Sequence, residues 1–136
     1  MRNINYLVVH CTATNQNTTI NSIKNYWRSV LKWRNPGYHV IVKADGTPVE
    51  ILPIERISNG VKGFNAESLH ISYIGGVDAA GRPHDTRTTA QKATLNKYLT
   101  HWRKMFPKAT IQGHRDFPGV TKACPSFNAK LEYKAL

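Results

Sequence analysis

The apolar residues of the chain gather in short runs that predict strands. A dense run of apolar and β-branched residues at 4–9 predicts a buried strand that ends at His10. Similar runs predict further strands, which occupy 38–43, 49–52, 69–76 and 109–112. The turn Ala44-Asp45-Gly46-Thr47 favours a hairpin between the first two of these, because Asp-Gly pairs suit tight turns between antiparallel strands.

Two other segments have the spacing of helices. Apolar residues recur three or four positions apart from 20 to 31, until Asn35-Pro36-Gly37 ends the pattern. The same spacing runs from 95 to 106, behind the capping box Thr88-Thr89-Ala90-Gln91 and before Pro107. We therefore expect an α/β fold, with one domain over residues 1–136 and a mixed sheet of about five strands flanked by helices.

Length and composition support one folded domain and point to an anionic partner. The 136 residues suffice for a single core, and the presence of only two cysteines excludes a disulfide-built mini-protein. No apolar run reaches the roughly 18 residues of a membrane span, and we expect no signal peptide, because the first apolar segment is too short for one. Nineteen Lys and Arg against eight Asp and Glu leave a net charge of +11, so we expect a polyanion near the protein.

The histidines and cysteines are candidates for a metal site assembled from distant segments. None of the six histidines and two cysteines has the local spacing of a zinc finger or of a His-Glu-x-x-His motif. His10, His114 and Cys124 nevertheless lie where predicted strands give way to loops. Two imidazoles and one thiolate would leave the fourth position of a tetrahedral zinc open for water. By residue type alone, hydrogen-bonded structural histidines, a small buried cysteine or a Cys11–Cys124 disulfide remain open as alternatives.

Six segments together resemble one known family. They are, in chain order, Val8–Thr14, Gly37–Gly46, Ile74–Asp78, Thr88–Gln91, Gly113–Asp116 and Lys122–Phe127. The same pieces occur in this order in the zinc-dependent N-acetylmuramoyl-L-alanine amidases, the family shared by small phage lysins and peptidoglycan recognition proteins. The likeness spans almost the whole chain, and the closing Lys-x-Cys-Pro-Ser-Phe makes it most similar to the phage lysozyme-type amidases.

This resemblance implies a set of site residues. One zinc ion per chain would be held by His10, His114 and Cys124, and Tyr38 and Lys122 would be catalytic. Hydrolysis of an amide needs a nucleophile stronger than water and a counter-charge for the oxyanion, which zinc and the Lys122 ammonium would supply. Tyr38 would donate a hydrogen bond to the oxyanion or orient the attacking water.

Two positions depart from the family pattern. His70 stands where relatives commonly have a glycine, and its role is left open. The segment 59–65 lacks the histidine that often follows a glycine in the corresponding loop of relatives. Phe64 and Asn65 in this segment are the candidates for binding the peptide or the sugar.

Two more residues are expected to support the site rather than to form it. His39 should point to the other side of its strand, because side chains alternate in direction, and this favours a core or supporting role. Asp116 lies two residues after His114 and either orients that imidazole or caps its loop.

The function implied by the resemblance is zinc-dependent hydrolysis of the amide bond between N-acetylmuramic acid and L-alanine in peptidoglycan. A phage endolysin would be made in the cytoplasm of the infected bacterial cell and act on the wall after release, as a monomer without a nucleic-acid or membrane partner. The alternatives are a bacterial cytoplasmic wall-recycling amidase and a non-catalytic peptidoglycan-binding module. The charge would also suit a nucleic-acid binder, but no reading motif is present, and Trp27 and Trp102 occupy predicted core positions.

Overall fold

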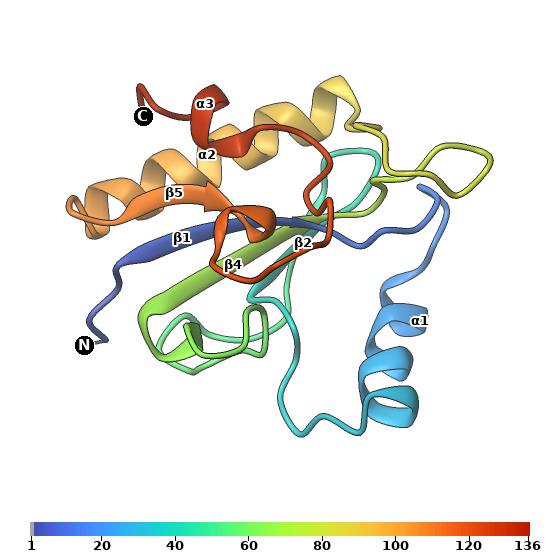
Figure 1. Cartoon of the computed structure of the whole chain (residues 1–136), viewed down its shortest axis with the longest axis horizontal. Coiled ribbons are helices and arrows are strands. Elements are labelled where there is room, and N and C mark those ends of the chain that lie inside the picture. Colours follow the sequence, from blue (N-terminus) through green and yellow to red (C-terminus); the bar gives the residue numbers. More distant parts are fainter. Residues whose placement is uncertain (1) are drawn as a thin grey trace.

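The computed structural model describes residues 2–136 and contains one sheet of five strands (Figure 1). In sheet order the strands are β3 (Pro48–Glu50), β2 (Val40–Val42), β4 (Ser68–Tyr73), β1 (Tyr6–Cys11) and β5 (Thr110–Gly113). β2 and β3 form an antiparallel hairpin, whereas β2, β4, β1 and β5 pair in parallel. The predicted α/β fold with a mixed sheet of five strands is therefore confirmed.

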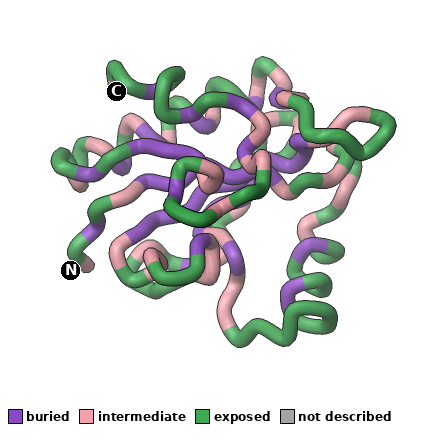
Figure 2. The backbone as a smooth tube through the Cα atoms, in the orientation of Figure 1, coloured by how far each residue is buried: buried purple, intermediate pink, exposed green. Residues whose placement is uncertain are grey.

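One face of the sheet is covered by the long helix α2 (Thr89–Met105) and the short helix α3 (Ala129–Glu132) (Figure 1). Leu7 and Val9 of β1 point to this face, where they join Leu95 and Leu99 of α2 in a fully buried core. Figure 2 shows the central strands as the most continuously buried part of the chain. Full burial of one such aliphatic side chain contributes about 1.5–3 kcal/mol, so this layer supplies much of the stabilisation.

The opposite face of the sheet is covered less evenly. Over it lie α1 (Ile20–Asn25), a π-helical turn (Tyr26–Val30) and the segment before β4, which ends in a 3₁₀ turn (Asn65–Glu67). Trp27 packs against Ile41 of β2, and Val61 packs against Val8 of β1. Between these two apolar clusters lie the polar side chains of the candidate site.

Several element boundaries differ from the sequence pattern; β2, for example, spans Val40–Val42 and not 38–43. The strand predicted at 69–76 ends at Tyr73, because Gly75 (φ 144°) and Gly76 (φ 101°) turn the backbone out of the strand. The helix predicted from 20 to 31 changes to a π-helical turn in its second half. α3 and the 3₁₀ turns are too short to show a period, so the pattern does not predict them.

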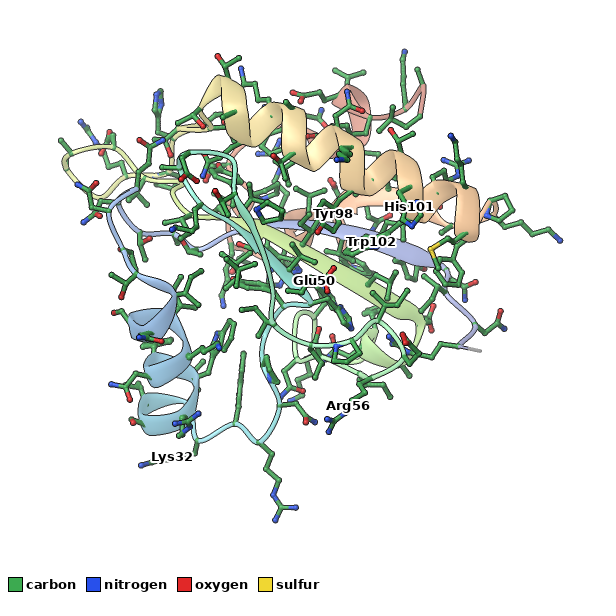
Figure 3. The ribbon with its side chains drawn as sticks, turned by 180° about the vertical axis from the view of Figure 1, so that it is seen from behind. Lys32, Glu50, Arg56, Tyr98, His101 and Trp102 are labelled. Carbon is green, nitrogen blue, oxygen red and sulfur yellow. The ribbon has the colours of Figure 1, made fainter. Side chains whose placement is uncertain are left out.

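Aromatic side chains of the helices pack into the core. Figure 3 shows Tyr98 and Trp102 on the side of α2 that faces the sheet. Their rings meet edge to face at 5.9 Å, and only 3% of Trp102 is exposed. Trp27 is buried as well, so core packing accounts for both tryptophans, as expected. Within residues 2–136, no helix is both long and apolar enough to cross a membrane.

A buried cation, Arg87, ties the segment before α2 to α3. Its guanidinium pairs with Asp85 at 2.9 Å and with Glu132 at 2.6 Å, and it lies 3.4 Å from the ring centroid of Phe127. Only 2% of the Arg87 side chain is exposed, whereas both carboxylates are partly exposed. This pairing fastens the C-terminal part of the chain, which carries part of the site, to the rest of the fold.

We predict that Arg87→Met lowers the free energy of unfolding by about 2–3 kcal/mol, because it removes the charge-assisted hydrogen bonds of a buried guanidinium to Asp85 and Glu132. Chemical denaturation measures this change. Arg82→Met is the matched control, since the Arg82–Asp78 pair has an arginine side chain that is 79% exposed. Such surface pairs contribute about 0–1 kcal/mol, so equal losses in the two variants would contradict the structural role of Arg87.

Candidate metal centre

The parallel pairing of β1 with β5 places two histidines next to each other. Val9 and Gly113 are register partners, so the residues that follow them, His10 and His114, meet at the carboxyl ends of these strands. The centroids of the two imidazole rings lie 4.9 Å apart. His10 is buried and His114 is half-buried, so solvent reaches the pair through His114.

The segment after β5 carries Cys124, and the sheet holds this segment in place. The Tyr73 hydroxyl at the end of β4 donates to the Pro125 carbonyl at 2.7 Å. The Ser126 hydroxyl donates to the Gly76 carbonyl at 2.9 Å. Both bonds fix the residues that follow Cys124, so its thiol is held at the same edge of the sheet as the two histidines.

The three side chains converge on one point. His10, His114 and Cys124 each offer one ligand atom, and these three atoms all lie within 4.8 Å of one another. Nδ1 of His10 is 3.9 Å from Sγ of Cys124. Ligand atoms on one tetrahedral zinc lie about 3.5 Å apart, given Zn–N and Zn–S distances of about 2.1 and 2.3 Å. The spacing and the donor types therefore fit a single metal ion.

Burial decides the protonation of these groups. It lowers the pKa of His10 well below the ordinary value, with the positive charges of neighbouring groups acting in the same direction. It also lowers the pKa of His114 to about 4, and the Lys122 ammonium adds to this effect. Both imidazoles are thus neutral at pH 7, and a neutral imidazole is the form that binds a metal.

The Cys124 thiol is the group that must lose a proton to bind a metal. Its hydrogen bond with the Cys11 thiol, and then its burial, raise the pKa of Cys124. Two features act the other way: the Cys11 N–H donates to Sγ at 3.2 Å, and the Lys122 charge favours the thiolate. Both cysteines are free thiols in the structure, so the Cys11–Cys124 disulfide considered from the sequence is not formed.

The two residues expected to be catalytic lie beside this group. The ring of Tyr38 is 4.9 Å from that of His10, and its hydroxyl donates to the Cys11 carbonyl at 3.3 Å. Burial raises the pKa of Tyr38, which favours the protonated phenol, a group that can donate a hydrogen bond. Lys122 is exposed two residues before Cys124, and its charge acts on both imidazoles.

His70, for which the sequence pattern provides no role, touches the group directly. Its Nδ1 lies 2.8 Å from Nε2 of His10. His39 stacks on His70 with a ring separation of 6.0 Å and an angle of 4° between the rings. His39 therefore lies on the same face of the sheet as Tyr38 and His10, contrary to the expectation. Strict alternation does not hold between Tyr38 and His39, because β2 begins only at Val40. The buried, supporting position of His39 agrees with the role expected for it.

The remaining candidates lie around this centre. Phe64 is half-buried and packs on the aromatic rings of Tyr6 and Phe117. Asn65 turns its side-chain oxygen inward, where it is 3.0 Å from Nε2 of His70. Asp116 accepts the N–H that precedes its 3₁₀ turn, so it caps the loop.

Comparison with known proteins identifies the family. The family model described as N-acetylmuramoyl-L-alanine amidase matches residues 1–127. The chain belongs to this family. The amidase is 37% identical over 122 residues to the endolysin of Enterobacteria phage K11, a match that covers 88% of this chain and 79% of the relative. The resemblance recognised in the sequence is thus confirmed.

Solved structures confirm the fold of the amidase. The endolysin of the Thermus scotoductus bacteriophage Ph2119 matches 92% of this chain and 79% of its own, with a TM-score of 0.77 and 26% identity. Drosophila PGRP-LB matches 99% of this chain and 82% of its own, with a TM-score of 0.78. At 14% identity the second match shows a common fold alone.

We predict that the affinity of the amidase for Zn²⁺ rises about tenfold from pH 5 to pH 6, because one proton leaves as the metal binds. That proton comes from Cys124, whose pKa is raised, while His114, with a pKa of about 4, is already neutral over this range. Titration calorimetry in two buffers measures the proton release. Cys124→Ala should bind more weakly and without this slope. Two or more protons released per Zn²⁺ would show that the imidazoles are not neutral beforehand.

Proposed function

We propose that this amidase is a zinc-dependent endolysin that cleaves the amide bond between the lactyl group of N-acetylmuramic acid and L-alanine in peptidoglycan. One observation carries the proposal: ligand atoms of His10, His114 and Cys124 lie within 4.8 Å of one another beside Tyr38. A non-catalytic wall-binding module would not need this arrangement, which argues for the enzyme.

The donor set favours zinc over harder cations. Two imidazoles and a thiolate are soft or borderline ligands, whereas magnesium and calcium prefer oxygen. Three protein ligands also leave a position for water or substrate, as in catalytic zinc sites. Zinc held by His10, His114 and Cys124 would supply a nucleophile at neutral pH by acidifying water, and would polarise the scissile carbonyl.

Tyr38 and Lys122 are proposed to act on the charge that develops at the carbonyl oxygen. Burial raises the pKa of Tyr38, which favours the protonated phenol that can donate a hydrogen bond to this oxygen. Lys122 lies on the exposed side of the site, where its ammonium can meet a substrate that comes from solvent. Fixed donors and charges of this kind stabilise an oxyanion without reorganisation during the reaction.

The net charge of +11 suits an insoluble anionic substrate. Bacterial walls carry anionic polymers and stem-peptide carboxylates, which attract a cationic enzyme through weak, salt-sensitive forces. The K11 relative is named an endolysin, which favours synthesis inside an infected cell and action on the wall after release. A bacterial wall-recycling amidase is the alternative with the same chemistry.

The test of this function is release of stem peptide from purified peptidoglycan. We expect mass spectrometry to detect new L-alanine amino termini with the native chain. A chelator should abolish the release, and added zinc should restore it. Cys124→Ser should lose both bound zinc and activity. Undiminished cleavage by a zinc-free preparation would contradict the proposal, and so would zinc-loaded protein that binds peptidoglycan without cutting it.

We expect Lys122→Met to lower kcat by about 10²–10³ and to leave zinc content unchanged, because it removes one group that stabilises the oxyanion. Lys130→Met is the matched control, since Lys130 is an exposed cation on α3. Steady-state kinetics on soluble muropeptide separates kcat from KM. Equal losses in both variants would mean that net charge, and not a local contact, explains the effect.

A further inference from the structure

A chain of hydrogen bonds links the loop before β4 to the ligand group. The Val61 N–H donates to Oδ1 of Asn65 at 2.7 Å, and the same oxygen is 3.0 Å from Nε2 of His70. Nδ1 of His70 is in turn 2.8 Å from Nε2 of His10. His70 is 0% and His10 is 1% exposed, so solvent does not compete for the contact between the two imidazoles.

The direction of each bond in this chain follows from its first member. A backbone N–H can only donate, so the Asn65 atom that faces Val61 is the carbonyl oxygen, which can only accept. Nε2 of His70 must therefore carry a hydrogen and donate to Asn65. His70 is fully buried and its ring contacts no carboxylate in the described part of the chain, so it is held as a neutral imidazole with one acceptor nitrogen. Nδ1 of His70 thus accepts the hydrogen on Nε2 of His10.

We propose that His70 is a positioning residue that selects the tautomer of His10. With its hydrogen on Nε2, His10 presents the lone pair of Nδ1, the atom 3.9 Å from Sγ of Cys124. The opposite tautomer would present an N–H to the cation and could not bind it. Metal-ligating histidines commonly donate their second N–H to a carboxylate or carbonyl, and here an imidazole serves as the acceptor. This inference rests on the proposed zinc site.

The surrounding residues hold the His70 ring in the required place. A Cβ on residue 60 would come within 2.2 Å of Nδ1 of His70, so the ring fits only because residue 60 is glycine. The backbone N–H of His70 donates to Nδ1 of His39 at 3.0 Å. Nε2 of His39 then donates to the Arg56 carbonyl at 2.8 Å. The absence of a side chain at Gly60 and the presence of the imidazole at His70 are therefore two parts of one arrangement.

The direct test is the tautomer of His10 in the zinc-free protein at pH 7. Long-range proton–nitrogen NMR spectra distinguish an imidazole protonated at Nε2 from one protonated at Nδ1. We expect the Nε2–H form of His10 in the native chain, and a mixture of both forms in His70→Leu. A native His10 protonated at Nδ1, or a tautomer unchanged in His70→Leu, would overturn the proposal.

Zinc affinity gives the second readout. Loss of a partner of this kind costs about 10–100-fold in metal affinity, so we expect that decrease for His70→Leu in a competition assay against a chelator. His101→Leu is the matched control, since His101 is exposed on α2, and it should leave the affinity unchanged. An affinity of His70→Leu equal to that of the control would contradict the proposal.

A conservative variant separates the hydrogen bond from simple packing. In His70→Asn the carboxamide oxygen takes the position of Nδ1, so this variant should keep the His10 tautomer and most of the zinc affinity. Gly60→Ala should displace the His70 ring and weaken zinc binding although it touches no ligand. If His70→Leu does not fold, the zinc affinities of these two variants test the inference. Weak zinc binding by His70→Asn would overturn it, and so would native zinc affinity in Gly60→Ala.

These outcomes are distinct from failure of the proposed function. A native chain that binds zinc and shows the expected tautomer, but does not cleave peptidoglycan, would refute the function and leave the role of His70 intact. An active zinc enzyme with the opposite His10 tautomer would refute only the role of His70.

Discussion

The parallel pairing of β1 with β5 is the constraint on which the site depends. Its register places His10 beside His114, although most of the chain separates them in sequence. The apolar layer under α2 maintains this register, because a slip of one residue would move Leu7 and Val9 out of the core. The alternation that buries these two side chains sends His10 to the other face. The alternation of side chains along β1 therefore both builds the core and directs His10 toward the metal centre.

The face of the sheet that carries the candidate metal centre is lined by neutral imidazoles and not by carboxylates. Burial lowers the pKa of four imidazoles, those of His10, His39, His70 and His114. Neutral imidazoles act as both donors and acceptors, so they can be linked in a directed chain without burying unpaired charge. Asp116, the acid nearest to the group in sequence, is occupied by its own loop. The Lys122 charge acts on His10 and His114, and the Arg2 charge acts on His39 and His70.

Sequence reasoning predicted the fold class, the five strands and the α2 capping box, since each has a period or a local signal. The ligand set came from family resemblance, because residue types alone left a disulfide or structural histidines open. The contact between His70 and Gly60 could not be predicted from the sequence. The His70 ring occupies the space that a Cβ at residue 60 would fill, and only the folded structure brings these two residues together. The ion pair between Arg87 and α3 was not predicted for a similar reason, since a buried ion pair between distant segments has no periodic signal in the sequence.

The most direct test of this account is X-ray absorption at the zinc edge of the protein loaded with one equivalent of zinc. The account predicts two nitrogen ligands at about 2.0–2.1 Å, one sulfur at about 2.3 Å and one light atom from solvent. A first coordination sphere without sulfur would contradict it, and so would one with two sulfurs, because each would show that Cys124, His10 and His114 do not share the ion.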